Sequence, residues 1–237
     1  MDADTERRSA RRAAAARRLR SFPFSLLLTA LVLFVLLDAL LPASRPVRSV
    51  LGLAYVAVML ATTRRLSRSG LHFATLVILA VAVVVARVVE WAAPARQLVS
   101  AEAVLIASLT GGYLLAILWR VFAAGPVNHD RIMGAIAGYL LMGAFWAFLY
   151  TAVVVALPGS FHIAAGAADT GLLPSDGGFP SIYFSFVSLL TMGYGDIVPA
   201  IRLTQTMAWV EGAMGQIYLT VLVARLVALQ VAASVSK

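Results

Sequence analysis

The chain has 237 residues and no cysteine; 61% of the residues are hydrophobic and 13% are charged. Soluble domains average about 45–50% apolar and about 25% charged residues, so this composition argues against a soluble enzyme, a disulfide-bonded secreted scaffold and a disordered chain. The formal net charge of +8 is compatible with nucleic acid or with anionic lipid as a partner, and the position of the basic residues decides between them.

Residues 1–21 form a basic tail that we expect to lie in the cytoplasm. Its seven arginines fall within residues 7–20 and directly precede an apolar run. Each such cation contributes about 1 kcal/mol to the binding of anionic headgroups, and no aromatic residues are interleaved with them to favour nucleic acid. We predict membrane lipids as the partner of this tail, and no nucleic acid. A cleaved signal peptide is disfavoured because the following run is too long.

Four apolar runs follow and are predicted to form a four-helix unit over residues 22–124. A membrane-spanning helix needs about 20 mostly apolar residues, and the second run is short by this measure. The runs are residues 22–41, 47–63, 71–92 and 98–124.

Four charged residues fall toward the outer ends of these runs: Asp38, Arg87, Glu90 and Glu102. Because a lone charge is costly inside a bilayer, we expect Arg87 to pair with one of the three carboxylates. A purely structural ion pair is the favoured interpretation, and a regulatory role is the alternative.

A linker at 125–131 leads to a second unit at 132–237. This second unit contains a fifth span at 132–157, a loop at 158–178 rich in Gly, Ala, Pro and Asp, an apolar segment at 180–190, and a sixth span at 201–233. As a helix, the eleven residues of 180–190 reach about 16 Å, too short to cross a bilayer. The sequence therefore predicts an all-α membrane protein with six transmembrane helices and a re-entrant helix between the last two.

The basic residues are distributed unequally across this topology. With the N-terminus inside, fourteen of them fall on the inner side and four on the outer side. The positive-inside rule then places both termini in the cytoplasm, and the loop and the re-entrant helix outside.

Directly after the short helix stands the segment Thr191-Met192-Gly193-Tyr194-Gly195-Asp196. It resembles the selectivity filter of the potassium channels, Thr-Val-Gly-Tyr-Gly followed by Asp, with Met192 in place of the usual Val or Ile. In such a filter, backbone carbonyls replace the hydration shell of K⁺. To aim successive carbonyls at one axis, alternate residues must adopt left-handed dihedrals, which Gly193 and Gly195 do without Cβ strain.

The resemblance implies that the K⁺ sites are formed by the carbonyls of Thr191, Met192, Gly193 and Tyr194, with the Thr191 hydroxyl below them. It also implies that Tyr194 points away from the axis and packs on the short helix, while Asp196 forms hydrogen bonds behind the filter.

Two further positions depart from the family pattern. Val187 stands where some relatives carry a carboxylate in the short helix, so a carboxylate pair with Asp196 is absent here. Leu190 replaces a second Thr. Together with Met192, these departures bear on the rigidity of the filter more than on its preference for K⁺.

The last span carries the candidate cavity and gating residues. Gly215 stands where relatives often have a hinge glycine, and close helix packing explains it equally well. Glu211 either forms hydrogen bonds behind the short helix or influences gating. Helical spacing places four residues on one face, which we expect to line the cavity below the filter. These are Gly212, Gln216, Leu219 and Val223.

The first four spans look like a voltage-sensor domain without its charges. In voltage-gated relatives the fourth span carries a cation at every third residue, each worth about 2.3 kcal/mol per 100 mV. Here Arg120 is the only basic residue of 98–124 and lies at its inner end. The chain has no P-loop, His-Glu-x-x-His or Gly-x-Ser-x-Gly motif, and its three histidines, His72, His129 and His162, are scattered. We therefore expect no enzyme activity, no cofactor, and no metal other than K⁺ in the filter.

One filter per chain supplies one part of a closed ring, and the resemblance implies four chains. We predict a homotetrameric, potassium-selective channel of the plasma or inner membrane that passes K⁺ passively and is not conventionally voltage-gated. The alternatives are a weakly selective cation channel, a non-conducting scaffold or regulatory subunit, and a channel-like potassium transporter. The last is disfavoured because such transporters carry four pore repeats in one chain and this chain shows one.

Overall fold

The computed structural model describes residues 23–41, 44–66, 70–93, 95–123, 129–164 and 179–235. The basic tail at 1–21, most of the linker and most of the loop at 158–178 lie outside these ranges. The elements in chain order are α2 (Pro23–Leu40), α3 (Arg45–Leu66), α4 (Gly70–Ala92), α5 (Arg96–Phe122), α6 (His129–Ala156), β1 (Phe161–Ile163), α7 (Ser181–Leu189), β2 (Ile197–Pro199) and α8 (Arg202–Val235).

The described chain is mainly helical, as the composition predicts. Among the residues that the structure describes, four helices are long and apolar enough to cross a membrane: α4, α5, α6 and the Arg202–Arg225 part of α8. The apolar stretches of α2 and α3, Phe24–Leu40 and Ser49–Thr63, are shorter. These lengths fit an all-α membrane protein.

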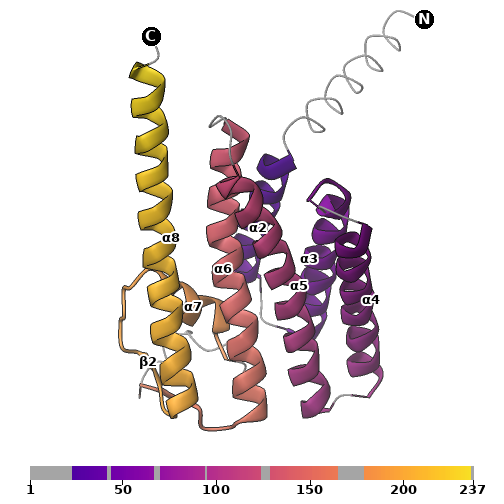
Figure 1. Ribbon diagram of the computed structural model, residues 1–237. Coiled ribbons are helices and arrows are strands. Elements are labelled where there is room, and N and C mark those ends of the chain that lie inside the picture. The colour runs from indigo at the N-terminus through magenta and orange to yellow at the C-terminus, as the bar shows by residue number, and fades with distance from the viewer. Residues whose placement is uncertain are drawn as a thin grey trace, which may run out of the picture.

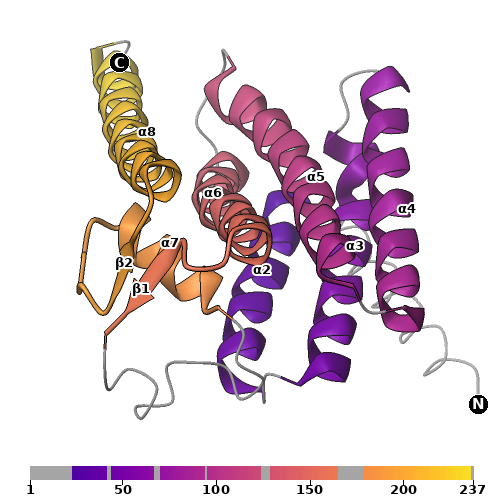
Figure 2. The same ribbon diagram turned by 90° about the horizontal axis from the view of Figure 1, so that it is seen from below.

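The molecule has two halves: a four-helix half, α2 to α5, and a pore-like half, α6 to α8 with the strands β1 and β2. Helix α6 joins the pore-like half to the four-helix half (Figure 1). It packs against α2 and α5 on one side and against α7 and α8 on the other, as the view from below shows (Figure 2). The short α7 lies between α6 and α8, while α3 and α4 lie on the far side of α2 and α5. The pore-like half therefore contacts the four-helix half through α6.

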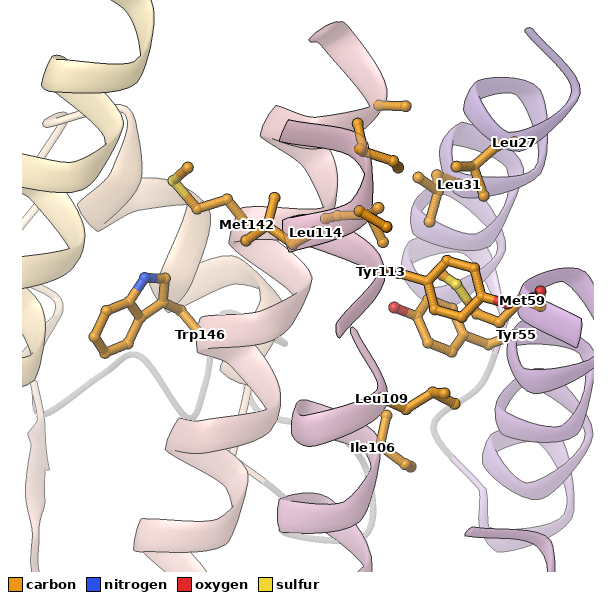
Figure 3. Packing of buried hydrophobic residues seen from close by; sticks show 14 of the residues in the cluster. Leu27, Leu31, Tyr55, Met59, Ile106, Leu109, Tyr113, Leu114, Met142 and Trp146 are labelled. Atoms are coloured by element: carbon orange, nitrogen blue, oxygen red, sulfur yellow. Dashed lines mark hydrogen bonds between the residues drawn. The ribbon is translucent and has the colours of Figure 1, made fainter. Parts of the chain in front are cut away.

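The four-helix half is held by apolar packing with polar groups paired inside it. Tyr113 of α5 reaches α3 beside Tyr55 and Met59 (Figure 3) and donates a hydrogen bond to the Met59 carbonyl. Tyr55 Oη lies 2.8 Å from Thr110 Oγ1. Since a bilayer offers no water to such groups, each hydroxyl must find its partner within the protein.

Two carboxylates of this half lie at Arg87. Arg87 Nε lies 2.5 Å from Glu102 Oε1, and Arg87 Nη1 lies 4.0 Å from Glu90 Oε2. The Glu102 side chain is 4% exposed, and a Cβ at Gly52 of α3 would lie 3.0 Å from Arg87 Nη2. The guanidinium therefore bridges α4 and α5 and lies over α3. Asp38 lies exposed in the last turn of α2.

Replacing Arg87 with Leu leaves Glu102 buried without its cation. We expect the free energy of unfolding to fall by about 3 kcal/mol, the usual effect of breaking a buried pair. Thermal unfolding of the purified protein in detergent measures this change. Arg96→Leu, at an exposed arginine that begins α5, is the control and should change the free energy of unfolding little. Equal shifts for both variants would contradict a stabilising role for the pair, whereas recovery in Arg87→Leu/Glu102→Leu would support it.

Candidate functional site

The backbone after α7 enters the left-handed region at every second residue. The φ angle is 56° at Thr191, 57° at Gly193 and 80° at Gly195. Met192 and Tyr194 keep negative φ, so the sign alternates through the segment. This is the alternation that aims successive carbonyls to one side. The sequence predicted positive φ at the two glycines. It did not predict positive φ at Thr191, because β-branched residues ordinarily avoid it.

The C-terminal end of α7 holds the start of this segment. Four backbone N–H groups donate to carbonyls of its last turns: Leu190 to Phe186 at 2.9 Å, Thr191 to Ser188 at 3.0 Å, and Met192 and Gly193 to Val187 at 2.9 and 3.5 Å. These bonds use carbonyls that a helix end leaves without partners. Val187 thus supports the segment through its backbone oxygen, and its side chain is buried. The segment begins at the negative end of the α7 dipole, which favours a cation.

Tyr183 of α7 supports the segment from behind and was missed by the sequence analysis. Its hydroxyl donates to Asp196 Oδ2 at 2.5 Å, and its ring stacks on Tyr194 with centroids 6.5 Å apart. The hydrogen bond to Asp196 raises the pKa of Tyr183 to about 12, so the phenol keeps its proton at neutral pH. Tyr183 lies one helical turn before Val187, so the two residues share one face of α7. This spacing could have indicated from the sequence that Tyr183 also supports the filter.

A small antiparallel sheet fixes the C-terminal end of the segment. Strand β1 pairs with β2 in the register Phe161–Pro199, His162–Val198 and Ile163–Ile197. The Ala164 N–H donates to the Asp196 carbonyl at 2.8 Å, and the Ala200 N–H donates to the Ser160 carbonyl at 2.9 Å. Residues 161–163, within the predicted loop at 158–178, therefore form a strand, and the prediction of helices alone missed this sheet.

Glu211 of α8 lies behind α7, which is one of the two roles left open by the sequence. The residue is fully buried. Tyr150 of α6 donates to Glu211 Oε2 at 2.7 Å, and Ser185 Oγ of α7 lies 2.5 Å from Glu211 Oε1. Ser185 Oγ also lies 2.7 Å from the Gly143 carbonyl oxygen of α6. One carboxyl group thus connects three helices.

Gly215 marks the closest approach of α8 to α7. A Cβ at this position would lie 2.7 Å from the Leu189 carbonyl oxygen, whereas a Cβ at Gly212 would lie 3.5 Å from the Ser188 oxygen. The structure thus gives Gly215 a packing role. Of the four residues expected on the cavity face, Gly212 lies against α7. The other three, Gln216, Leu219 and Val223, are exposed in the single chain.

The C-terminal part of α8 is attached to the end of α5 and the start of α6. Arg225 Nη2 donates to the Ala123 carbonyl, and its guanidinium carbon lies 5.6 Å from the centre of the Phe122 ring. Tyr218 Oη donates to the Ala135 carbonyl at 2.6 Å. Arg225 is one of the fourteen basic residues predicted on the inner side, and the sequence did not indicate these partners because they come from distant parts of the chain.

Residues 132–231 match a family model described as "Ion channel". The match supports the potassium-channel assignment that the filter motif suggests, and this family is not a class of enzymes. Together with the four long apolar helices, it identifies a multi-pass membrane protein. A search of curated proteins and a search of solved structures each found no match.

Gly215→Ala should weaken the packing of α7 on α8, because its Cβ meets a backbone oxygen that cannot rotate away. We expect a loss of about 1–3 kcal/mol in the free energy of unfolding, the usual cost of overpacking. Gly212→Ala on the same helix is the matched control and should cost much less. Thermal unfolding in detergent compares the two, and equal losses would contradict the packing role of Gly215.

Proposed function

Because residues 132–231 belong to the ion-channel family, we propose that the protein is a potassium-selective channel that conducts K⁺ passively. The observation that carries the proposal is the alternation of left-handed residues at Thr191, Gly193 and Gly195, within the Thr-x-Gly-Tyr-Gly motif. This alternation is the backbone conformation that a carbonyl-lined filter requires. K⁺ is the cargo, coordinated by the carbonyls of residues 191–194 and by the Thr191 hydroxyl.

The proposed pore is formed by four copies of the chain around a central axis. A single chain supplies one strand of carbonyls, while a dehydrated K⁺ needs a ring of oxygens. The exposure of large side chains within the filter segment supports assembly: Met192 is 51% and Tyr194 61% exposed in the single chain. On α8, Ile217 is 62% and Val223 57% exposed. Neighbouring copies would cover part of these surfaces.

The proposed topology has six spans, with α2, α3, α4, α5, α6 and α8 crossing the membrane and α7 re-entrant. The nine residues of α7 reach about 14 Å, too short to cross. Its packing between α6 and α8 supports a re-entrant role, since such elements must be enclosed by protein. We place both termini in the cytoplasm of a plasma or inner membrane, with the basic tail on anionic lipid.

We propose that gating is not conventionally voltage-driven. The basic residues of α5, Arg96 and Arg120, lie in its first and last turns, and none lies between them. The helix therefore lacks the row of charges that couples to the membrane field.

Selectivity for K⁺ over Na⁺ is favoured over weak cation selectivity by the support behind the filter. Met192 is flexible and Leu190 lacks a hydroxyl, which argues for a looser filter. The Tyr183–Asp196 hydrogen bond and the Tyr183–Tyr194 stack argue against a looser filter, because they restrain the segment from behind. A non-conducting scaffold remains the alternative from another class, and recordings separate all three.

Gly193→Ala should abolish most of the K⁺ flux of the purified protein in lipid bilayers. A Cβ at φ 57° costs about 1–2 kcal/mol, so we expect a loss of roughly five- to thirtyfold. Gly159→Ala is the matched control, since Gly159 has φ 81° outside the filter. The wild-type reversal potential should follow the K⁺ gradient. A reversal near zero in opposing equal K⁺ and Na⁺ would indicate weak selectivity, and absence of wild-type current would indicate a scaffold.

Native mass spectrometry of the full chain in detergent should give the mass of four copies. We expect four copies because each chain supplies one strand of filter carbonyls, and the resemblance to potassium channels implies a ring of four such strands around K⁺. A dominant mass of one or two copies under conditions that preserve K⁺ flux would contradict the tetramer.

A further inference from the structure

The buried contact between α6, α7 and α8 assigns a protonation state to Glu211. We propose that Glu211 is held protonated and uncharged as a hydrogen-bond donor to Ser185, and that in this form it positions α7 behind the filter. Its effect on conduction rests on the proposed channel function, whereas its protonation can be measured without any current.

The proton inventory of the contact requires a hydrogen on Glu211. Ser185 Oγ lies 2.5 Å from Glu211 Oε1 and 2.7 Å from the Gly143 carbonyl oxygen. A serine hydroxyl carries one proton, and a carbonyl only accepts. If Glu211 were ionised, one of these two short oxygen–oxygen contacts would have no proton between its atoms.

A protonated Glu211 satisfies every group in the contact. Its Oε1 hydroxyl donates to Ser185 Oγ, and Ser185 donates its own proton to the Gly143 carbonyl. Tyr150 donates to Glu211 Oε2 at 2.7 Å. The result is a continuous chain of donors and acceptors across three helices, of the kind that a buried site needs.

The charges around Glu211 do not favour its ionised form. Glu211, Ser185 and Tyr150 are each fully buried. Within the described ranges, the titratable side chains that face Glu211 from packed elements are Tyr139 and Tyr150 of α6. The ion pairs found in those ranges involve Arg87 and its two partners, not Glu211. A carboxylate buried without a cation is costly, and gaining a proton removes that cost.

The contact fixes α7 relative to α8 at two successive turns. Glu211 meets Ser185, and four residues later on both helices Gly215 meets Leu189. Between these two points lies Val187, whose carbonyl accepts the Met192 N–H at 2.9 Å. A shift of α7 along α8 would therefore move an anchor of the filter. Glu211 acts through α7 and is a positioning residue.

The direct test is infrared spectroscopy of the purified full-length protein labelled with ¹³C-glutamate, at neutral pH. We expect a carbonyl-stretch band of a protonated carboxyl group that is absent in Glu211→Gln. Glu102→Gln is the matched control and should keep the band, because Glu102 pairs with Arg87. Identical spectra for wild type and Glu211→Gln would overturn the proposal.

The second test is the pH profile of K⁺ flux in lipid bilayers. Glu211→Gln can donate to Ser185 and accept from Tyr150, so it should retain flux to within about twofold at neutral pH. Glu211→Ala leaves two buried hydroxyls without this partner and should lose about tenfold or more. Wild-type flux should fall at alkaline pH, where Glu211 loses its proton, while Glu211→Gln should not show this fall.

The two tests separate the positioning role of Glu211 from the proposed channel function. A loss in Glu211→Gln as large as in Glu211→Ala, with tetramer intact, would overturn the positioning role, as would identical alkaline profiles for wild type and Glu211→Gln. If the wild type carries no K⁺ current, the channel proposal fails, and the infrared band still decides the protonation of Glu211.

Discussion

The pairing of buried polar groups around α7 governs the packing of the pore-like half of this molecule. A helix too short to span a bilayer cannot leave its polar groups to lipid, so its neighbours must supply partners. Helix α6 does so at both ends of α7: Thr151 Oγ1 lies 2.6 Å from Ser181 Oγ, and Tyr139 donates to the Leu189 carbonyl at 3.2 Å. Between these ends, Glu211 of α8 and Tyr150 of α6 meet behind Ser185.

The filter-like segment depends on this enclosure because it has little regular structure of its own. Its N-terminal end is held by the last carbonyls of α7, and its C-terminal end by the pairing of β1 with β2. Tyr183 restrains the middle through Asp196 and Tyr194. A left-handed threonine at 191 is unfavourable alone and persists because both ends are fixed. The proposed K⁺ sites therefore rest on contacts made by three helices and a sheet.

The four-helix half is joined to this site through packing and through hydrogen bonds, among them the one that the Phe24 N–H of α2 donates to Asp130 Oδ1 of α6 at 3.2 Å. Helices α2 and α5 lie against α6, and Arg225 attaches α8 to the carbonyl at the end of α5. The Arg87–Glu102 pair lies within the four-helix half and links its own helices. The division into units at 22–124 and 132–237 stays a prediction. The packing nevertheless provides a physical connection through which the first unit can influence the last helix.

The sequence alone determined the features that depend on local chemistry. Apolar length located the helices to within a few residues: the run predicted at 71–92 folds as Gly70–Ala92, and the short helix predicted at 180–190 folds as Ser181–Leu189. The positive φ of Gly193 and Gly195 also followed, because only glycine adopts it without strain. Only the tertiary structure decided which distant side chains meet. Asp196 finds Tyr183, Glu211 finds Ser185 and Tyr150, and β1 finds β2. These partners are separated by up to 61 residues, and composition and periodicity carry no information about which of many polar groups share a buried site.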